Sequence, residues 1–283
     1  MTSRTAYITG GASGIGLAVA HALHNRGMRI AIADINLKAA QESAKQLNAT
    51  ATASQKHLAL EVDVSSWDSQ VAAFSKAVET FNRIDVVIVN AGVGEKVFVP
   101  NDGGTGQGFA KPNLQILDVD LNGFLYTSAL AIQQMRRQDV DHEGLRGRII
   151  GTASVCGFYC VPTLPVYTAA KHGAVGFVRS YGKYLPDEQI TLNAVCPHVA
   201  RTNISTGVFY DHLEEMKLLT PMEGIVDAFM QFIDRGDMSG ECLEIGPIGG
   251  PQLRMPPGAL NSESDRLNKL LYERGRPLHE AKP

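Results

Sequence analysis

A tyrosine and a lysine stand four residues apart at Tyr167 and Lys171, in a segment that is typical of a helix. Side chains with this spacing share one helix face, so both can act on the same substrate atom. A phenol has an unperturbed pKa of about 10, but a nearby ammonium stabilises the phenolate and lowers that pKa. Ser154, thirteen residues before the tyrosine, can donate a hydrogen bond to an oxygen that gains negative charge. The segment therefore predicts a tunable proton donor with an oxyanion partner.

A tyrosine four residues before a lysine is common on helices by chance, so the surrounding elements must show whether this pair is catalytic. An apolar run at 148–152 is short enough to be a buried strand, and Ser154 follows where that strand should end. Pro162 and Pro165 bound a loop, after which 166–185 is expected to be a helix. Strand, serine, loop and helix in this order favour an active site.

The start of the chain carries a second chemical signal, a glycine turn between a strand and a helix. A β-prone run at 5–9 is followed by Gly10, Gly14 and Gly16, and apolar periodicity then continues to Arg26. Glycines here let the backbone approach a pyrophosphate, while the N–H groups of the helix N-terminus face the phosphates. Glycine also serves any tight connection, but the place of this turn favours dinucleotide binding.

Asp34 ends a second strand-like run, eighteen residues beyond Gly16. This is near the offset at which an acidic residue receives the ribose hydroxyls in dinucleotide-binding folds. Its charge would repel a 2′-phosphate, so NAD(H) is the favoured cofactor and NADP(H) the less favoured one. The alternative is that Asp34 caps the helix expected from Leu37, a role that Asn36 can serve as well.

The remaining pattern alternates strands and helices. The run at 84–89 is apolar apart from Asp85, as expected for a central strand covered on both faces, and it ends at Asn90. A glycine-rich, polar stretch at 94–111 predicts a long functional loop, and 201–219 is expected to be irregular. Further strands are expected at 58–62, 191–196 and 241–245, and further helices at 37–48, 67–81, 113–135, 221–233 and 262–273, the last capped by Ser262.

Composition bounds the class of protein. The chain has 283 residues, of which 44% are hydrophobic and 19% charged, which suits an α/β domain with a sizeable core. We expect one domain at 1–250 and a C-terminal extension at 251–283. A net charge of −3 offers no basis for binding nucleic acid or an anionic membrane. No apolar run is long enough to span a bilayer and no signal-peptide pattern precedes the first strand, so a cytoplasmic protein is expected.

The four cysteines, Cys156, Cys160, Cys196 and Cys242, are expected to be reduced in that compartment. Three residues separate Cys156 from Cys160, which suggests a metal or redox site as one interpretation. No cysteine or histidine pair stands nearby at ligand spacing, so buried thiols are the favoured interpretation and no metal is expected.

With these motifs in order, the chain resembles the short-chain dehydrogenase/reductase family over about residues 4 to 250. The resemblance rests on Thr9-Gly10-x-x-x-Gly14-x-Gly16, Asp63-Val64, Asn90-Ala91-Gly92, Asn122, Ser154, Tyr167-x-x-x-Lys171 and the segment from Pro197 to Thr202. It implies a doubly wound, Rossmann-type parallel sheet of the α/β class, with strand order 3-2-1-4-5-6-7, helices on both faces and a nicotinamide cofactor.

The resemblance also implies roles for single residues. Tyr167 would be the catalytic acid or base, Ser154 would orient the substrate oxygen, and Lys171 would bind the nicotinamide ribose and lower the tyrosine pKa. Asn122 would hold a water that connects Lys171 to solvent. The implied cofactor-binding residues are Gly10, Ser13, Gly14, Ile15, Gly16, Asp34, Ile35, Asp63, Val64, Asn90, Ala91, Gly92, Tyr167, Lys171, Ala200 and Thr202.

Two departures from the family pattern concern the substrate end. His198 stands where the family usually has glycine, and it either contacts substrate or only shifts its loop. The chain also continues well past Gly250, where the family commonly stops soon after its last strand. Aromatic residues in or near the long loops either wall a bulky apolar pocket or pack locally. They are Phe98, Phe109, Phe158, Tyr159, Phe209 and Tyr210.

The favoured function is an NAD(P)(H)-dependent oxidoreductase that interconverts a secondary alcohol and a ketone, with Tyr167 as acid or base. A bulky apolar or polyketide-like secondary metabolite is one candidate substrate. The alternative is a catalytically idle regulator or binding protein on the same scaffold, against which the intact Ser154, Tyr167 and Lys171 argue.

A homodimer or homotetramer is expected, because helices 113–135 and 166–185 pair across a two-fold axis in the resembled family. Both carry apolar residues beyond those one sheet face needs, namely Leu130, Ile132, Phe177 and Val178. The tail helix at 262–273 is expected to cross to a neighbouring subunit or to cover the pocket mouth, because it carries a leucine stripe. The alternative is that the tail packs on its own subunit or stays loose.

Overall fold

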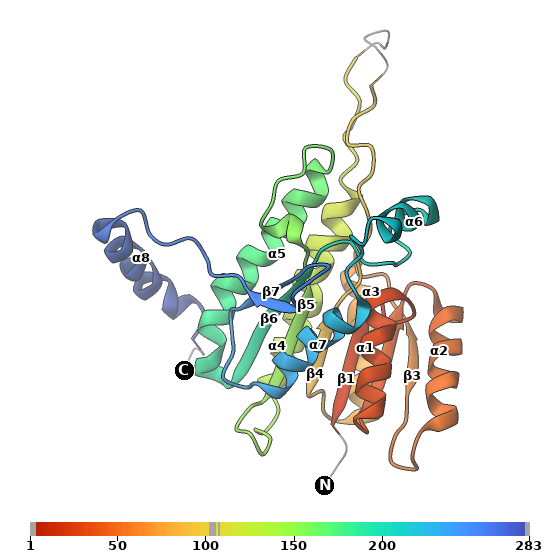
Figure 1. Ribbon diagram of the computed structural model, residues 1–283. Helices are drawn as coiled ribbons and strands as arrows, with labels where there is room; N and C mark the ends of the chain where they lie inside the picture. The colour runs from red at the N-terminus through yellow and green to blue at the C-terminus, as the bar shows by residue number, and fades with distance from the viewer. Residues whose placement is uncertain (1–3, 102–105, 107, 281–283) are drawn as a thin grey trace.

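The computed structural model describes residues 4–101, 106 and 108–280, which form one central sheet with helices on both faces (Figure 1). The strand order is β3-β2-β1-β4-β5-β6-β7-β8. The expected doubly wound order 3-2-1-4-5-6-7 is therefore confirmed, and an eighth strand extends it at one edge. The order reverses between β1 and β4, which is where ligands bind in sheets of this kind.

Seven strands run parallel, and β1 and β4 are buried along their whole length because helices cover both faces. These strands are β1 (Thr5–Thr9), β2 (Arg29–Asp34), β3 (Leu58–Glu61), β4 (Val86–Val89), β5 (Gly147–Thr152), β6 (Ile190–Pro197) and β7 (Cys242–Ile245). The eighth, β8 (Pro251–Leu253), pairs antiparallel with β7.

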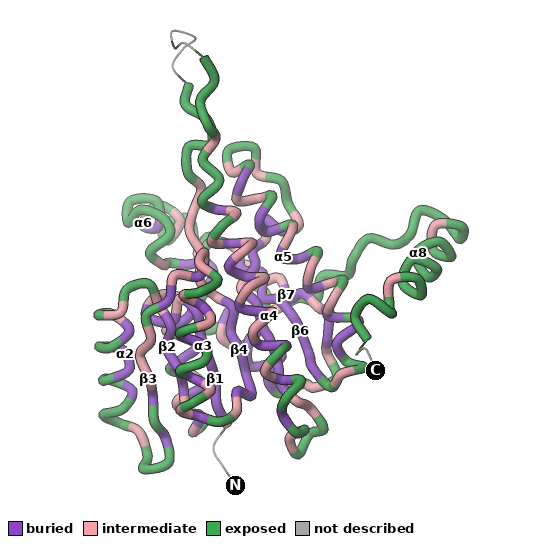
Figure 2. Tube along the Cα trace, turned by 180° about the vertical axis from the view of Figure 1, so that it is seen from behind, coloured by how far each residue is buried: buried purple, intermediate pink, exposed green. Residues whose placement is uncertain are grey.

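The helices divide between the two faces of the sheet (Figure 2). Those on one face are α3 (Trp67–Phe81), α4 (Gly123–Met135) and α5 (Pro165–Tyr184), whose apolar residues join one core cluster. Those on the other face are α1 (Gly14–Asn25), α2 (Leu37–Thr50) and α7 (Met222–Asp234), which join a second cluster. The sheet is thus sealed on both sides and is accessible to ligands only at its ends.

The carboxyl ends of the parallel strands lie at one end of the sheet, and the segments with chemical signals follow directly from them. β1 leads into Gly10, β4 into Asn90, β5 towards Ser154 and β6 into His198. The loop that follows β4 extends from this end of the molecule (Figure 1). This end therefore holds the candidate functional site.

Several elements differ from the expected ones. The stretch at 201–219 contains a helix, α6 (Gly207–Glu215). Tyr210 is its one buried residue, so the helix has no buried apolar face that would leave a pattern in the sequence. The segment after Gly250 contains β8, which is too short for a periodic pattern. α8 (Ser262–Gly275) is capped by Asn261, whose Oδ1 accepts a hydrogen bond from the N–H of Ser264 at 2.9 Å. In the expected loop at 94–111, residues 102–105 and 107 lie outside the described residues.

The helix expected at 113–135 contains an irregularity near its start. A π-helical turn, η1 (Leu117–Asn122), precedes α4. Such turns are rare, because they break the regular hydrogen-bond ladder of the helix, and they often occur at functional sites. The turn changes which side chains face the sheet, and sequence periodicity alone does not reveal it.

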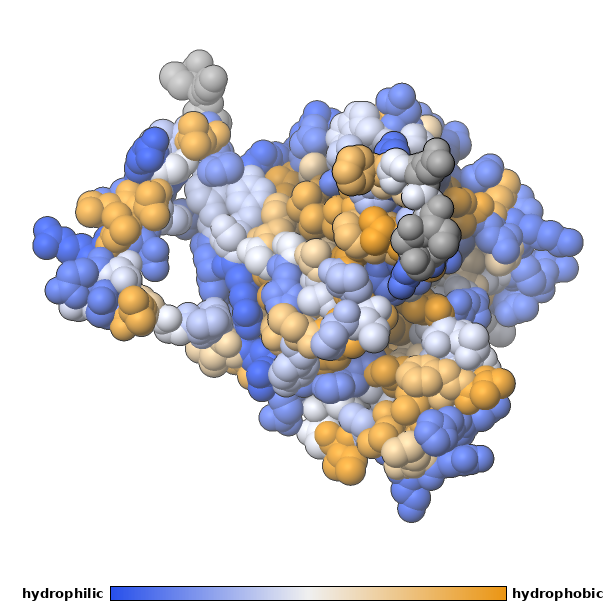
Figure 3. Space-filling model, turned by 90° about the horizontal axis from the view of Figure 1, so that it is seen from above, coloured by the Kyte–Doolittle hydropathy of each residue, from blue (hydrophilic) through white to orange (hydrophobic). Residues whose placement is uncertain are grey.

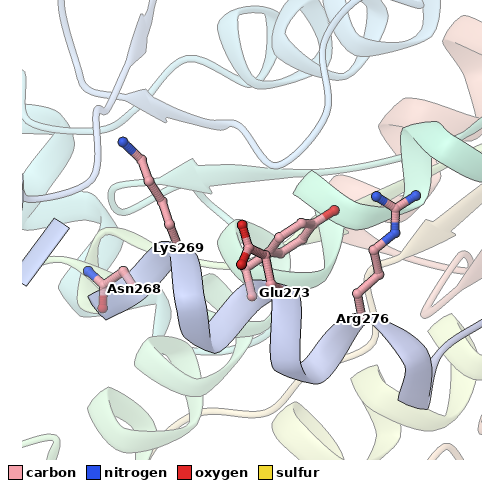
Figure 4. A pocket seen from close by; sticks show the side chains of 5 residues that line it. Asn268, Lys269, Glu273 and Arg276 are labelled. Atoms are coloured by element: carbon pink, nitrogen blue, oxygen red, sulfur yellow. The ribbon is translucent and has the colours of Figure 1, made fainter. Parts of the chain in front are cut away.

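α8 stands away from the sheet at the end of an extended connection (Figures 1 and 2). None of its residues is buried, and Leu267, Leu270 and Leu271 are each more than half exposed. Arg276, just after the helix, lies 3.3 Å from the carboxylate of Asp187 on the body. A surface hollow along this segment is lined by Asn268, Lys269, Tyr272, Glu273 and Arg276 (Figure 4). The division of the chain at residue 250 stays a prediction, and β8 ties the start of the extension to the sheet.

Within the described part of the chain, no helix has both the length and the apolar character needed to cross a membrane. The four cysteines are free thiols. Cys160 is exposed, whereas Cys156, Cys196 and Cys242 are buried.

Candidate active site

Tyr167 lies in the first turn of α5, close to the carboxyl ends of the strands. The helix begins at Pro165, whose fixed backbone angle suits a first helical position. Glu95, from the loop after β4, accepts a hydrogen bond from the backbone N–H of Tyr167 at 2.8 Å. A carboxylate at a helix N-terminus is stabilised by the free N–H groups there. This contact fixes the turn that carries the tyrosine.

Lys171 lies one helical turn further on, and its ammonium is 5.2 Å from the ring centroid of Tyr167. Its side chain is almost fully buried, and Nζ donates a hydrogen bond to the carbonyl of Thr152 at 3.4 Å. Ser154 is buried just after β5, and its hydroxyl accepts a hydrogen bond from the N–H of Cys156 at 3.1 Å. The structure thus brings the serine, the tyrosine and the lysine to one place.

The residue of the π turn that contacts Lys171 is Asp120 and not the expected Asn122. The amide of Asn122 donates a hydrogen bond to Asp118 Oδ1 at 3.2 Å. The group that meets Lys171 is Asp120, whose Oδ2 lies 2.9 Å from Nζ. A charged residue between apolar Leu117 and Leu121 was the available signal, because a buried carboxylate requires a partner. The relay role of Asn122 stays a prediction.

Electrostatics at this site work in opposite directions. Burial raises the pKa of Tyr167 most, the ammonium of Lys171 lowers it, the carboxylate of Asp120 raises it, and a hydrogen bond from Ser154 lowers it. The net direction is upward. For Lys171, burial acts to lower the pKa, but Asp120 and Tyr167 outweigh burial and hold the pKa above its usual range. The lysine therefore carries its charge at neutral pH.

The glycine turn excludes side chains by close packing. Gly10 and Gly14 have positive φ angles of 61° and 52°, which favour glycine. A Cβ on Gly16 would lie 2.3 Å from the carbonyl oxygen of Gly10. Ser13 precedes α1 without making a side-chain capping bond, so the helix N–H groups stay available to a ligand. Thr202 packs over Gly14 from the loop after β6. These features fit a pyrophosphate.

Asp34 faces the glycine turn at the end of β2. Its Oδ2 accepts a hydrogen bond from the N–H of Ala12 at 3.1 Å, and its Oδ1 accepts one from the N–H of Asn36 at 3.0 Å. The capping role belongs to Asn36, whose side chain accepts a hydrogen bond from Ala39 N–H. Ile35 beside it is 70% exposed. This placement suits recognition of a ribose and an adenine.

Other expected cofactor residues lie at the same carboxyl end of the sheet. Asp63 accepts hydrogen bonds from the N–H and hydroxyl of Ser65, which fixes the loop after β3. The amide of Asn90 donates to the carbonyls of Thr9 and Gly10 and accepts from Thr152, so it joins β1, β4 and β5. The structure also places Ile15, Val64, Ala91, Gly92 and Ala200 at these strand ends and in the α1 first turn.

His198 belongs to a polar cluster at the end of β6 and β7. Its Nε2 lies 2.8 Å from Glu244 Oε1, and Tyr159 donates a hydrogen bond to the same carboxylate at 3.1 Å. Arg254, just after β8, lies 3.0 Å from the other oxygen of Glu244. The histidine is therefore held by β7, whose Glu244 is in turn paired with Arg254 after β8. Glu244 was not identified from the sequence, because its partners come from three separate elements.

Known proteins are similar to this chain in sequence. Residues 4–212 match the family model described as short chain dehydrogenase. The short-chain dehydrogenase/reductase prx7 of Penicillium rubens is 33% identical over 238 residues, which cover 81% of this chain and 80% of that protein. Human 15-hydroxyprostaglandin dehydrogenase [NAD(+)] is 30% identical over 237 residues, covering 80% of this chain and 82% of that one.

A solved structure extends the likeness to three dimensions. The crystal structure of a short-chain type dehydrogenase/reductase from Mycobacterium marinum has a TM-score of 0.71 at 25% identity. The alignment covers 86% of this chain and 94% of that one. Because the family model spans well over half of the sequence and the fold agrees, the chain belongs to the short-chain dehydrogenase/reductase family and is an oxidoreductase.

Proposed function

We propose that this protein interconverts a secondary alcohol and a ketone with a nicotinamide cofactor, and that Tyr167 exchanges the proton. The observation that carries the proposal is that the ring of Tyr167 lies 5.2 Å from a buried ammonium and that its phenol is within hydrogen-bond reach of Ser154. When bound, the nicotinamide supplies or accepts the hydride. The chain itself supplies the proton, the oxyanion partner and the charge that stabilises phenolate.

The proton has a defined path at this site. In ketone reduction, the phenol of Tyr167 donates its proton to the carbonyl oxygen while Ser154 donates a hydrogen bond to the same atom. In alcohol oxidation, the phenolate accepts the hydroxyl proton. The ammonium of Lys171 stabilises that phenolate, and we propose that it also binds the nicotinamide ribose. Burial of the lysine strengthens its effect, because little water screens the charge.

NAD(H) is the cofactor we propose, with NADP(H) as the less favoured alternative. The carboxylate of Asp34 lies at the glycine turn, where it can accept the ribose hydroxyls and repel a 2′-phosphate. The name of the human relative, 15-hydroxyprostaglandin dehydrogenase [NAD(+)], supports this choice. We propose for the further cofactor-site residues the same roles that the family resemblance implies.

A panel of secondary alcohols and ketones tests the proposed function, with NAD(H) consumption followed by absorbance. Tyr167→Phe keeps the ring and removes the proton donor, so kcat should fall at least ~10²-fold, the usual size of a positioned acid–base contribution. The dissociation constant for NAD should change little. Retained turnover in this variant would refute the mechanism. NAD binding without turnover on any substrate would instead favour the idle binding protein.

We also propose a bulky apolar substrate, such as a polyketide-like secondary metabolite. Exposed apolar side chains gather at the end of the molecule that carries the site, on the loop after β4 and around α6 (Figure 3). Phe98 and Phe209 are each about two-fifths exposed, whereas Tyr210 is buried against its own loop. The first two support a pocket wall, and the last is local packing. A series of alcohols of increasing apolar size should show falling KM values.

A homodimer or homotetramer in the cytoplasm completes the proposal. Ile132 and Val178 are buried in the core of the chain, so the support for assembly now rests on half-buried Leu130 and Phe177 and on α8. The exposed leucine stripe of α8 is too apolar to be left in water without cost. We propose that it contacts a second copy of the chain. The four free thiols fit a reducing compartment.

A further inference from the structure

Asp120 is a buried carboxylate next to the tyrosine–lysine pair, and the proposed chemistry does not use it. Its side chain is fully buried, and Oδ2 lies 2.9 Å from the ammonium of Lys171. Its other oxygen, Oδ1, accepts a hydrogen bond from the N–H of Val93 at 2.8 Å. A buried carboxylate is tolerated only when it is paired and hydrogen-bonded, and these two contacts meet that requirement.

The backbone around Asp120 holds it against the lysine. It belongs to η1, the π-helical turn that precedes α4. Gly92, in the loop just after β4, lies so close that a Cβ there would be 3.0 Å from Asp120 Oδ2. Three elements therefore meet at this carboxylate: the π turn that carries it, the loop after β4 that packs on it, and α5 that supplies the ammonium.

Several titratable groups face the tyrosine–lysine pair. They are Asp120 from η1, Cys156 from the turn after β5, Cys196 from β6 and Glu95 from the loop after β4. Burial raises the pKa of both cysteine thiols, so they are neutral near pH 7. Glu95 bonds the backbone of α5 rather than the ammonium. Asp120 is the carboxylate that opposes the lysine directly.

We propose that Asp120 is a positioning residue that anchors the ammonium of Lys171 and offsets part of its charge, so that Tyr167 works in a more alkaline range than the lysine alone would set. This inference rests on the proposed function and goes beyond it, since it assigns a second residue that controls the proton donor. A more alkaline range suits alcohol oxidation, because that direction releases a proton to solvent.

The pH profile of kcat/KM for alcohol oxidation tests the proposal. Asp120→Asn keeps the shape of the side chain and removes its charge, so the lysine should act on the phenol without opposition. The midpoint of the acid limb should then move to lower pH by about one unit, the size expected for one neighbouring charge. Asp118→Asn is the matched control, because it removes an exposed carboxylate from the same turn, and its midpoint should equal that of the unmodified protein.

Two results would overturn the proposal: an unchanged midpoint with a uniform loss of kcat at every pH, or a midpoint that moves to higher pH. If Asp120→Asn does not fold, Asp120→Ser also lacks the charge and can still accept the Val93 hydrogen bond. An ultraviolet difference titration against Tyr167→Phe reads tyrosine ionisation without turnover. It should show easier ionisation in the Asp120 variants, and an inactive unmodified protein with that shift would refute the proposed function while supporting the role of Asp120.

Discussion

The glycine turn and the substrate end of the molecule are specified in opposite ways. In the turn, backbone atoms approach so closely that a Cβ on Gly16 would lie 2.3 Å from the oxygen of Gly10. At the substrate end, Val97 and Val208 leave most of their side chains exposed. The glycine turn works because no side chain occupies the space near its backbone. The substrate end instead carries exposed apolar side chains that can contact a ligand. The first is therefore sensitive to a single methyl group, and the second to the choice of ligand.

Among the effects that test this contrast between the two regions, the largest is expected in the turn. Gly16→Ala forces a methyl group against backbone atoms that have no room to move, and overpacking of this kind costs about 1–3 kcal/mol. The dissociation constant for NAD should rise at least ~10-fold and Tm should fall. Gly224→Ala is the matched control, because its methyl group would meet only Ile245 at an ordinary 3.6 Å. Normal NAD affinity in Gly16→Ala, measured by calorimetry, would contradict the close-packed turn.

Cofactor choice sharpens the contrast within the same region. Asp34→Ala combined with Ile35→Arg removes a charge that repels phosphate and adds one that attracts it. The ratio of kcat/KM for NADP(H) to that for NAD(H) should rise roughly tenfold or more. Steady-state kinetics with both cofactors provide the measurement. An unmodified protein that already prefers NADP(H) would show that Asp34 has another role.

A smaller effect is expected from the tail, at the opposite extreme of exposure. Deleting residues 259–283 removes α8 and keeps β8 paired with β7. Light scattering should show fewer subunits per particle than for the full chain. KM should change by less than about threefold, because α8 does not touch the described catalytic residues. A full chain that is monomeric at micromolar concentration contradicts the proposed assembly.

Point variants separate the leucine stripe from the rest of that helix. Replacing Leu267, Leu270 and Leu271 with Ser should reproduce the loss of mass, whereas Lys269→Ala should not. A drop in mass with Lys269→Ala alone would show that charge, not apolar contact, holds the subunits together.

The smallest effect concerns the stability of the protein at acid pH, through a histidine pair near the helices that follow β1 and β2. His57 is buried beside His24, with 3.0 Å between their ring nitrogens, and burial, followed by the charge of His24, lowers the pKa of His57 to about 4. Between pH 6.5 and about 4 the unfolded chain binds more protons, so stability present above 6.5 is lost as the pH falls through this window. Tm measured across it should fall less in His57→Gln. His142→Gln, at an exposed site, should behave like the unmodified protein.

Sequence spacing was sufficient for the parts that depend on local rules. The glycine turn and the helix that carries Tyr167 and Lys171 each leave a periodic or spacing signal, and the structure has them. The strand order was implied by the resemblance to a known family, and the structure has it too. Asp120 and Glu95 were not identified, because each acts through a partner far away in the chain. The family resemblance assigned a role to Asn122. The structure shows that Asp120, two positions earlier in the π turn, is the residue that contacts Lys171.

The same limit applies to contacts between elements. The cluster around Glu244 joins β7, the end of β6 and the residue after β8, and no window of sequence contains all three. The stretch that forms α6 was expected to be irregular. The helix buries only one side chain, so its sequence carries no apolar stripe from which a helix could be predicted. Where stability comes from tertiary contacts rather than from a repeating pattern, sequence analysis has nothing periodic to detect.

The added strand β8 also determines what kinds of self-association the sheet permits. An unprotected edge strand offers free N–H and C=O groups to any other extended chain, which is a route to aggregation. Here the last strand is only three residues long, begins with a proline that has no N–H to offer, and is followed by Arg254, which pairs with Glu244. A chain with this much exposed apolar surface can therefore associate through its helices without extending its sheet from the β8 edge.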